Sequence, residues 1–206
     1  GNQWDNIYHE HIYYYSITAL HNMFKPYDMT IVDFEEIPIH SGSIRVTVVN
    51  KKDISPQKVL DRIELESKTI CDLNYLEKYT KNVRTSIELF NSTILGLSET
   101  YKIAGYGASG RANMFCNIVG LDESKIKFIV DESPERCGRY IANTEIPIVD
   151  IDVLRDSDID LLIIFAWNYS KMIMEKTQFR KFKYIVAFPK VQLVNSYEEL
   201  KGFDSI

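Results

Sequence analysis

The sequence lacks the features of secreted and membrane-spanning proteins. Its three cysteines, Cys71, Cys116 and Cys137, are far apart and form no CxxC pair. Isolated cysteines are typical of free thiols in a reducing compartment, so we expect a cytoplasmic protein. No apolar run approaches the roughly 20 residues that span a bilayer, and no signal peptide opens the chain. Because Gly1 stands where methionine is usual, we expect a chain trimmed at its amino end.

An excess of positive charge is also absent. The chain has 24 Lys and Arg against 29 Asp and Glu, a net charge of -5. This balance excludes a broad surface for nucleic acid or anionic membranes, so we expect neither as a partner, although a local basic pocket can still bind a phosphate. What is present is an ordinary globular composition, 45% hydrophobic and 26% charged, in 206 residues. That length suits one large domain or two small ones.

The first sixty residues predict a helix followed by two strands. Ser16 is a capping residue, and Ile17, Leu20 and Phe24 recur at the three- to four-residue spacing of one helix face. Residues 29–37 and 43–49 are rich in strand-forming side chains. The short loop between them contains glycine, which favours an antiparallel hairpin.

A helical stretch of about forty residues is predicted from Ser55-Pro56, a capping residue followed by a proline suited to the first helical position. Two apolar stripes mark it: Leu60, Ile63, Ile70, Leu73 and Leu76, then Val83, Ile87, Phe90, Ile94 and Leu97. Helical spacing of apolar residues is typical of a packing face. We therefore expect a connecting or packing helix here.

Beyond Tyr101 the pattern alternates between strand and helix. Strands are predicted at residues 102–104, 126–130, 159–165 and 183–188. Helices are predicted up to about residue 119, where Gly120 can terminate the first, and over residues 170–179. The third strand is almost wholly apolar, as in a parallel sheet covered on both faces. The alternation indicates a doubly wound α/β domain.

A glycine-rich sequence follows the first of these strands. Gly105, Gly107 and Gly110 match G-x-G-x-x-G between strand and helix, and Asp131 lies 21 residues beyond the last glycine. This context matches a dinucleotide-binding fingerprint. The same turn can bind any phosphate or carboxylate at the helix amino end, with Arg111 adding a charge, or can be a purely structural tight turn.

Polar and aromatic side chains gather near the amino end. Tyr8, His9, Glu10 and His11 are consecutive, and further tyrosines follow. A metal site here would need more ligands, and only His21 and His40 remain. A catalytic histidine supported by a tyrosine and a carboxylate needs fewer groups, because imidazole accepts a proton near physiological pH. The residues alone leave these alternatives open.

Six motifs in fixed order carry a resemblance to a known family. They are Asp5-Asn6-Ile7-Tyr8-His9-Glu10-His11, Pro38-Ile39-His40-Ser41-Gly42-Ser43-Ile44-Arg45, Ala104-Gly105-Tyr106-Gly107-Ala108-Ser109-Gly110-Arg111-Ala112-Asn113, Val130-Asp131 with Gly138-Arg139-Tyr140, Ile146-Pro147-Ile148 and Ala166-Trp167-Asn168. Together they resemble the carboxyl-terminal half of the S-adenosylmethionine-dependent sugar C-methyltransferases, which methylate a carbon of a nucleotide-linked keto-deoxysugar. The resemblance covers residues 4–190.

The resemblance implies a protein of three parts: a zinc-binding module, a methyltransferase domain that binds S-adenosylmethionine, and a Rossmann-like domain. Residues 1–53 then correspond to the end of the methyltransferase domain, residues 54–99 to a helical connector and residues 100–206 to the Rossmann-like domain. The expected fold class is α/β, a doubly wound parallel sheet preceded by a helix, a hairpin and a long helix. Zinc and the methyl donor belong to parts outside this chain. We expect neither bound here, and we expect no activity from the chain alone.

The resemblance also implies roles for individual residues. His11 is the expected base that forms an enolate, with Tyr8 and Glu10 orienting it. The expected contacts to a small-molecule nucleotide sugar are His9, His40, Ser43, Arg45, Gly105, Tyr106, Gly107, Ser109, Gly110, Arg111 and Asp131, and no metal ligand is expected. The chain departs from the family pattern at Ser41, where a glycine is usual, and at Glu145, where a histidine is usual. The alternatives are a stand-alone nucleotide-binding module and an NAD-dependent oxidoreductase.

Overall fold

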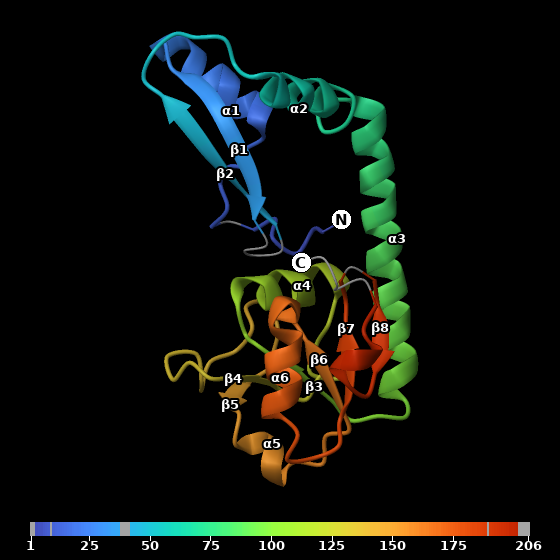
Figure 1. The fold of residues 1–206 in the computed structure, drawn as a ribbon. Coiled ribbons are helices and arrows are strands. Elements are labelled where there is room, and N and C mark those ends of the chain that lie inside the picture. The colour runs from blue at the N-terminus through green and yellow to red at the C-terminus, as the bar shows by residue number, and fades with distance from the viewer. Residues whose placement is uncertain (1–2, 9, 38–41, 189, 202–206) are drawn as a thin grey trace. The chain divides into compact units, whose positions relative to one another are not determined.

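A computed structural model of the chain describes residues 3–8, 10–37, 42–188 and 190–201. The chain divides into two compact units, which are treated separately below. The larger unit comprises Gly1–Glu10 and Asn82–Phe203, and the smaller unit comprises His11–Lys81 with Asp204–Ile206. Figure 1 labels the elements of both units. None of the helices in the described ranges is long and apolar enough to cross a membrane.

The smaller unit contains the predicted helix and hairpin. Helix α1 (Ile17–Phe24) begins at Ser16, whose Oγ accepts a hydrogen bond from the Ala19 N–H at 3.1 Å. Strands β1 (Thr30–Ile37) and β2 (Ser43–Val49) pair in antiparallel register. Both predictions are confirmed. A helix cap and a two-residue alternation are local signals, and the surrounding structure does not override them here.

The forty-residue helix prediction is wrong in one respect, since the stretch contains two helices. Helix α2 (Gln57–Ser67) ends before residue 68, and helix α3 (Leu73–Ser98) begins anew. Asp72 starts α3, because its Oδ1 accepts a hydrogen bond from the Tyr75 N–H at 2.8 Å. The proline at residue 56 lies at the cap position of α2, so the preceding serine does not cap this helix.

The core of the smaller unit is short of apolar residues and contains a buried carboxylate. Its fully buried apolar side chains belong to Ile17, Ile31, Phe34 and Val59. Glu66 of α2 is only 3% exposed. Its two oxygens accept hydrogen bonds at 2.6–3.1 Å from the Ile17 N–H, the Thr18 N–H and hydroxyl, and the Arg62 guanidinium. Glu66 therefore satisfies the free N–H groups at the start of α1.

The larger unit is built on a six-stranded sheet with the order β5-β4-β3-β6-β7-β8. The strands are β3 (Ile103–Tyr106), β4 (Ile129–Asp131), β5 (Ile148–Asp150), β6 (Leu161–Ile164), β7 (Lys183–Val186) and β8 (Gln192–Val194). All neighbours are parallel except β7 and β8. Along the chain, β4 and β5 add to one side of β3, and β6, β7 and β8 add to the other side. A switch point therefore lies between β3 and β6. The predicted α/β class with a Rossmann-like sheet is confirmed.

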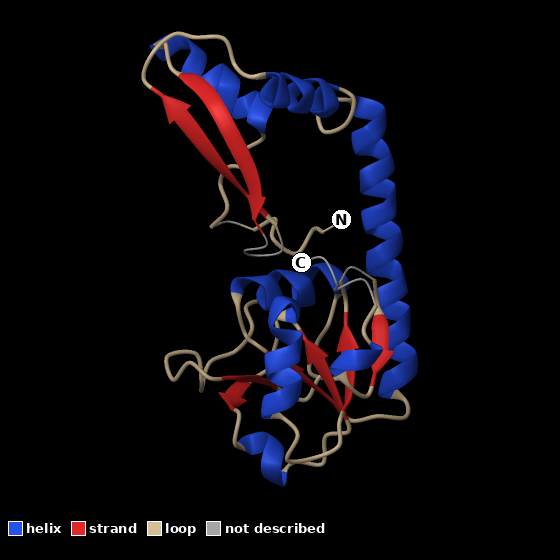
Figure 2. Ribbon diagram, viewed as in Figure 1, coloured by secondary structure: helices blue, strands red, loops and turns tan. Residues whose placement is uncertain are grey.

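The helices of this unit are the last part of α3 together with α4 (Gly110–Val119), α5 (Val153–Asp156) and α6 (Ser170–Lys176), drawn in blue in Figure 2. Gly120 ends α4 with a φ of 73°, as predicted. The second predicted apolar stripe packs on the core of the sheet with all five of its residues. The first packs only in part: Ile63 packs on the core of the smaller unit, whereas Leu73 is 76% exposed and Ile70 is 46% exposed.

Candidate functional site

The glycine-rich turn is shorter than its sequence suggests. Gly105 lies inside β3, and α4 already begins at Gly110. A methyl group on Gly105 would lie 2.6 Å from Cε2 of Phe165 and 2.8 Å from Cγ1 of Ile129. Gly107 has a φ of 91°, where a side chain is strained. Two of the three glycines are therefore required by the packing and the backbone of the sheet itself.

Asp131, at the end of β4, is committed to hydrogen bonds within the protein. It is 5% exposed. Its carboxylate accepts from the Ala108 N–H at 2.7 Å and the Ser133 N–H at 2.8 Å, and Nη1 of Arg136 lies 3.1 and 3.2 Å from its two oxygens. In dinucleotide-binding proteins an acid at this place holds the ribose. Here it ties the glycine turn to the loop after β4.

Tyr106, the last residue of β3, belongs to a second polar group. Its hydroxyl donates to Oε1 of Glu132 at 2.7 Å, and Lys176 binds the same carboxylate. Burial, reinforced by the negative charge of Glu132, raises the pKa of Tyr106 above its ordinary value. The phenol therefore stays protonated and serves as a donor inside the protein.

The amino-terminal segment packs against the helix that follows the turn. The ring of Trp4 stacks on Phe115 of α4 with ring centroids 4.9 Å apart and an interplanar angle of 20°. Its edge also meets Phe188, with ring centroids 5.6 Å apart. Trp4 is only 4% exposed. These contacts fix the start of the segment that carries the histidine cluster.

Asp5 makes the next contact of this segment. One oxygen of its carboxylate accepts a hydrogen bond from Nε1 of Trp167 at 2.7 Å and lies 3.8 Å from Nη1 of Arg111. Arg111 also donates to Oδ1 of Asn168 at 3.0 Å. Burial raises the pKa of Asp5, while the Trp167 hydrogen bond and the charge of Arg111 partly oppose the rise. The other carboxylate oxygen is buried and has no partner among the described residues.

Tyr8 covers the last glycine of the fingerprint. A methyl group placed on Gly110 would lie 3.0 Å from Cε2 of the Tyr8 ring. Ser109 occupies the cap position of α4 and makes no capping hydrogen bond with its side chain. Glu10, two residues further along, is exposed. A dinucleotide bound in the usual way needs a carboxylate that can hold its ribose. The Asp131 carboxylate is already bound to backbone N–H groups, and the Tyr8 ring fills the side-chain space at Gly110.

Three other predicted residues belong to the smaller unit. His11 is exposed, and its ring centroid lies 6.4 Å from that of Tyr14. Ser43 lines a pocket of about 530 Å³ in that unit. Arg45 is exposed and pairs with Glu35 at 2.5 Å. His9 and His40 lie outside the described residues. Within the larger unit the structure brings together Tyr8, the glycine turn, Arg111 and Asp131.

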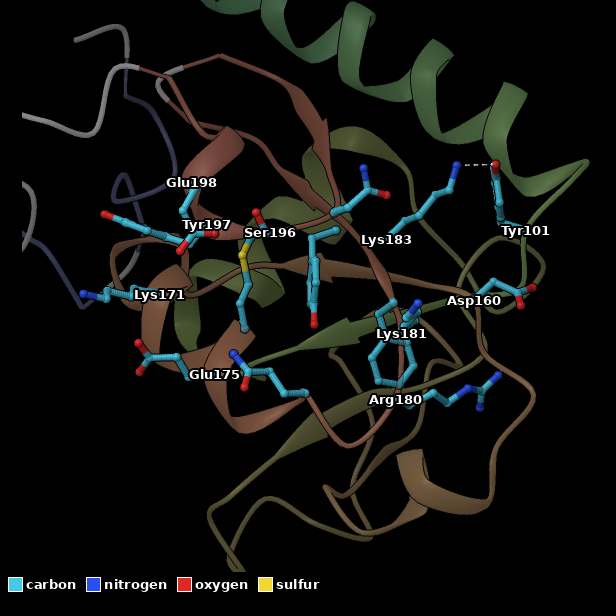
Figure 3. A pocket seen from close by; sticks show the side chains of 15 residues that line it. Tyr101, Asp160, Lys171, Glu175, Arg180, Lys181, Lys183, Ser196, Tyr197 and Glu198 are labelled. Atoms are coloured by element: carbon cyan, nitrogen blue, oxygen red, sulfur yellow. Dashed lines mark hydrogen bonds between the residues drawn. The ribbon is translucent and has the colours of Figure 1, made fainter.

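The larger unit also contains a pocket of about 760 Å³ beside α6 and β7 (Figure 3). Lys171, Lys181 and Lys183 supply cations to its wall, and Nζ of Lys183 donates to the Tyr101 hydroxyl at 2.9 Å. None of the predicted site residues that the structure describes lines this pocket. In the described ranges, no group of three or more His, Cys, Asp or Glu could hold a metal ion. The zinc implied by the resemblance was assigned outside this chain, so it stays a prediction.

The residues that local sequence patterns missed are Trp4, Asp5, Trp167 and Asn168. No spacing rule links Asp5 to Trp167, which are 162 positions apart. The available signal was the presence of Asp5, Trp167 and Asn168 in the ordered motifs, which marked these positions but not the contact between them; Trp4 lies outside the motifs.

Comparison with known proteins agrees with this architecture. A family described as the C-methyltransferase C-terminal domain matches residues 38–189. A curated protein, the C-methyltransferase NovU of Streptomyces niveus, is 25% identical over 211 residues, covering 97% of this chain and 49% of that protein. The chain therefore spans about half the length of the curated relative that it matches. Because the family match covers more than half of the sequence, this chain belongs to the family of the C-methyltransferase C-terminal domain.

Proposed function

We propose that this chain is part of an S-adenosylmethionine-dependent methyltransferase that adds a methyl group to a carbon of a nucleotide-linked keto-deoxysugar. The family match and the similarity to the Streptomyces C-methyltransferase support C-methylation. The described residues do not fit the methyl donor at the glycine turn, because Tyr8 lies against Gly110. We assign the donor to the part of the relative that this chain does not match, and we expect no methyl transfer by residues 1–206 alone.

In the proposed reaction His11 acts as the base. Neutral imidazole removes a proton from the carbon next to the ketone, and the electron pair of that C–H bond forms the enolate. Tyr8 and Glu10 orient the base or the sugar. When bound, S-adenosylmethionine supplies an electrophilic methyl group. The proton stays on His11 until solvent removes it.

One observation carries this proposal. The contacts of Trp4, Asp5 and Tyr8 hold the start of the histidine cluster against the glycine turn between β3 and α4. Open α/β sheets bind their ligands outside the carboxyl ends of the strands, next to a switch point. Tyr8 and Glu10 therefore belong to the edge where a substrate of this fold is expected. We also propose Ser43 and Arg45 as contacts to sugar hydroxyls or phosphate.

The test uses the complete methyltransferase that contains this chain, with S-adenosylmethionine and a thymidine-diphosphate-linked keto-deoxysugar. His11→Ala should abolish methyl transfer and the exchange of the substrate C–H proton with deuterated water, while donor affinity stays unchanged. His21→Ala is the matched control, because His21 belongs to the same unit but to helix α1. The control should keep turnover within about twofold. Retained turnover in His11→Ala would refute the assignment of the base.

A further inference from the structure

We propose that the glycine-rich turn is a docking site for the chain's own segment Trp4 to Tyr8, and that Asp5 is a positioning residue for Tyr8 and Glu10. The docking stands on the geometry of the larger unit alone. Its importance for catalysis rests on the function proposed above.

Asp5 is the first reason for this inference. Its side chain is almost completely removed from water, at 2% exposure, yet among the described residues one side chain donates to it and one arginine lies at 3.8 Å. A carboxylate in such surroundings is costly to bury, and these two partners offset only part of that cost. The cost of burying an acid here is the ground for giving it a role beyond stability.

The groups around Asp5 hold it in one place. The Trp167 indole is 2% exposed and donates its Nε1–H to the carboxylate. Arg111 is oriented by its hydrogen bond to Asn168, and its guanidinium carbon lies 5.9 Å from the centre of the Trp167 ring. The contacts of Asp5 and Arg111 thus link the first turn of α4 to the short helix η3 (Trp167–Tyr169) after β6.

Tyr8 is the second reason. Gly110 is the first residue of α4 and has no unusual backbone conformation that would require glycine. Alanine is normally favoured over glycine in a helix. The absence of a side chain on Gly110 makes room for the ring of Tyr8, which lies 3.0 Å from where a Cβ would be. This glycine of the fingerprint therefore serves the chain's own tyrosine.

The segment also has a defined internal shape. The Ile7 N–H donates to the Trp4 carbonyl at 3.1 Å, which closes a turn between the two docked aromatic residues. Glu10 follows Tyr8 by two residues, a reach of at most about 7 Å of chain. Docking of Trp4, Asp5 and Tyr8 thereby limits where Glu10 can lie, and His11 follows it directly.

The docking can be measured in the 206-residue chain without any enzymatic assay. Its only two tryptophans, Trp4 and Trp167, both belong to the docked segment or its site and are buried. Gly110→Leu should raise the acrylamide quenching constant of the tryptophan fluorescence at least twofold, and Gly110→Ala should raise it less. Gly96→Leu is the matched control, because it places the same side chain on α3 where nothing lies within 4 Å. Equal quenching in Gly110→Leu and its control would overturn the docking.

The positioning role is tested in the complete methyltransferase. Trp167→Phe and Asp5→Ala should lower kcat about 10- to 100-fold while KM for the sugar and for the donor stays within about threefold. Asp5→Asn should recover part of the loss, because its amide oxygen can still accept from the Trp167 Nε1–H. A purely structural role would lower the unfolding temperature and leave kcat of the folded enzyme unchanged, and that result would overturn the positioning role.

The two proposals fail in different ways. If the complete protein methylates no nucleotide-linked keto sugar, the proposed function fails, and the quenching comparison still decides the docking. If methyl transfer occurs and Gly110→Leu shows neither extra quenching nor a lower kcat, the docking fails and the proposed function stands.

Discussion

The least exposed acids of the two compact units have opposite surroundings. Glu66 of the smaller unit accepts four hydrogen bonds from side chains and backbone, whereas Asp5 of the larger unit accepts one from another side chain among the described residues. Burial alone raises the pKa of both. At Glu66 the hydrogen bonds from Thr18, Ile17 and Arg62 bring the pKa below its ordinary value, but at Asp5 the pKa stays raised. Glu66 therefore stabilises the smaller unit, whereas the burial of Asp5 in the larger unit is only partly compensated.

The largest expected effect comes from removing the stabilising acid. Glu66→Ala leaves the first N–H groups of α1 and the Arg62 guanidinium without their partner, which should destabilise the smaller unit by about 3–5 kcal/mol. Because both tryptophans belong to the larger unit, urea unfolding followed by tryptophan fluorescence should stay as in the wild type. Far-UV circular dichroism should show an additional early transition.

Glu64→Ala is the control for this substitution. Glu64 lies on the same helix, and its side chain is exposed. Its replacement should leave both unfolding transitions unchanged. If Glu66→Ala shifts neither transition, the hydrogen-bonded carboxylate is not what holds the smaller unit together.

The next effect concerns the larger unit, which apolar packing stabilises. Gly105→Ala places a methyl group 2.6 Å from Phe165 and 2.8 Å from Ile129, both buried. Overpacking of this kind should cost about 1–3 kcal/mol, seen as a lower urea midpoint in tryptophan fluorescence. Gly96→Ala, in open space on α3, should instead stabilise the protein by about 0.5–1 kcal/mol. A neutral Gly105→Ala would mean that Phe165 and Ile129 do not pack closely against β3 at this position.

The smallest effect is a difference in pH dependence. With its pKa raised, Asp5 holds its proton longer in the folded state, so the larger unit should lose stability as pH rises from about 3.8 through the folded pKa. With its pKa lowered, Glu66 should cost the smaller unit stability as pH falls below about 4.5 and on through its folded pKa. Each slope is at most on the order of 1.4 kcal/mol per pH unit.

Asp5→Asn and Glu66→Gln isolate these two contributions, because neither amide titrates. Urea midpoints are measured between pH 3 and pH 7. In Asp5→Asn the midpoint of the larger unit should no longer fall as pH rises, and in Glu66→Gln the midpoint of the smaller unit should no longer rise with pH. An unchanged pH profile in Asp5→Asn would show that the Asp5 carboxylate is not desolvated in the folded protein.

Local signals predicted much of the fold. The Ser16 cap, the hairpin pattern and the alternation after Tyr101 identified α1, β1, β2, β3, β4, β6 and β7. Strands β5 and β8 were missed. Each has three residues, as β4 has, but β4 lies at the end of the longer apolar-rich run at residues 126–130. The break between α2 and α3 was missed because the apolar stripe runs on across it, although Asp72 is itself a capping residue.

The site was harder to predict, because its decisive contacts join distant parts of the chain. The spacing of Gly105, Gly107, Gly110 and Asp131 describes a turn and an acid, but it cannot say what fills them. In the structure Asp131 binds the backbone of the turn, and Tyr8 covers the last glycine. Only tertiary packing brings residues 4–8 to this place, and no local pattern encodes it.

The ring of Tyr8 on Gly110 makes the chain a competitor of its own ligands. Tyr8 lies a few residues from the docked Trp4 and Asp5, and a group on so short a tether acts at an effective concentration in the millimolar range. A free phosphate or nucleotide that needs the space of the Tyr8 ring must displace the ring before it can bind. The binding free energy measured for such a ligand is then the free energy of ligand binding less the free energy of Tyr8 docking.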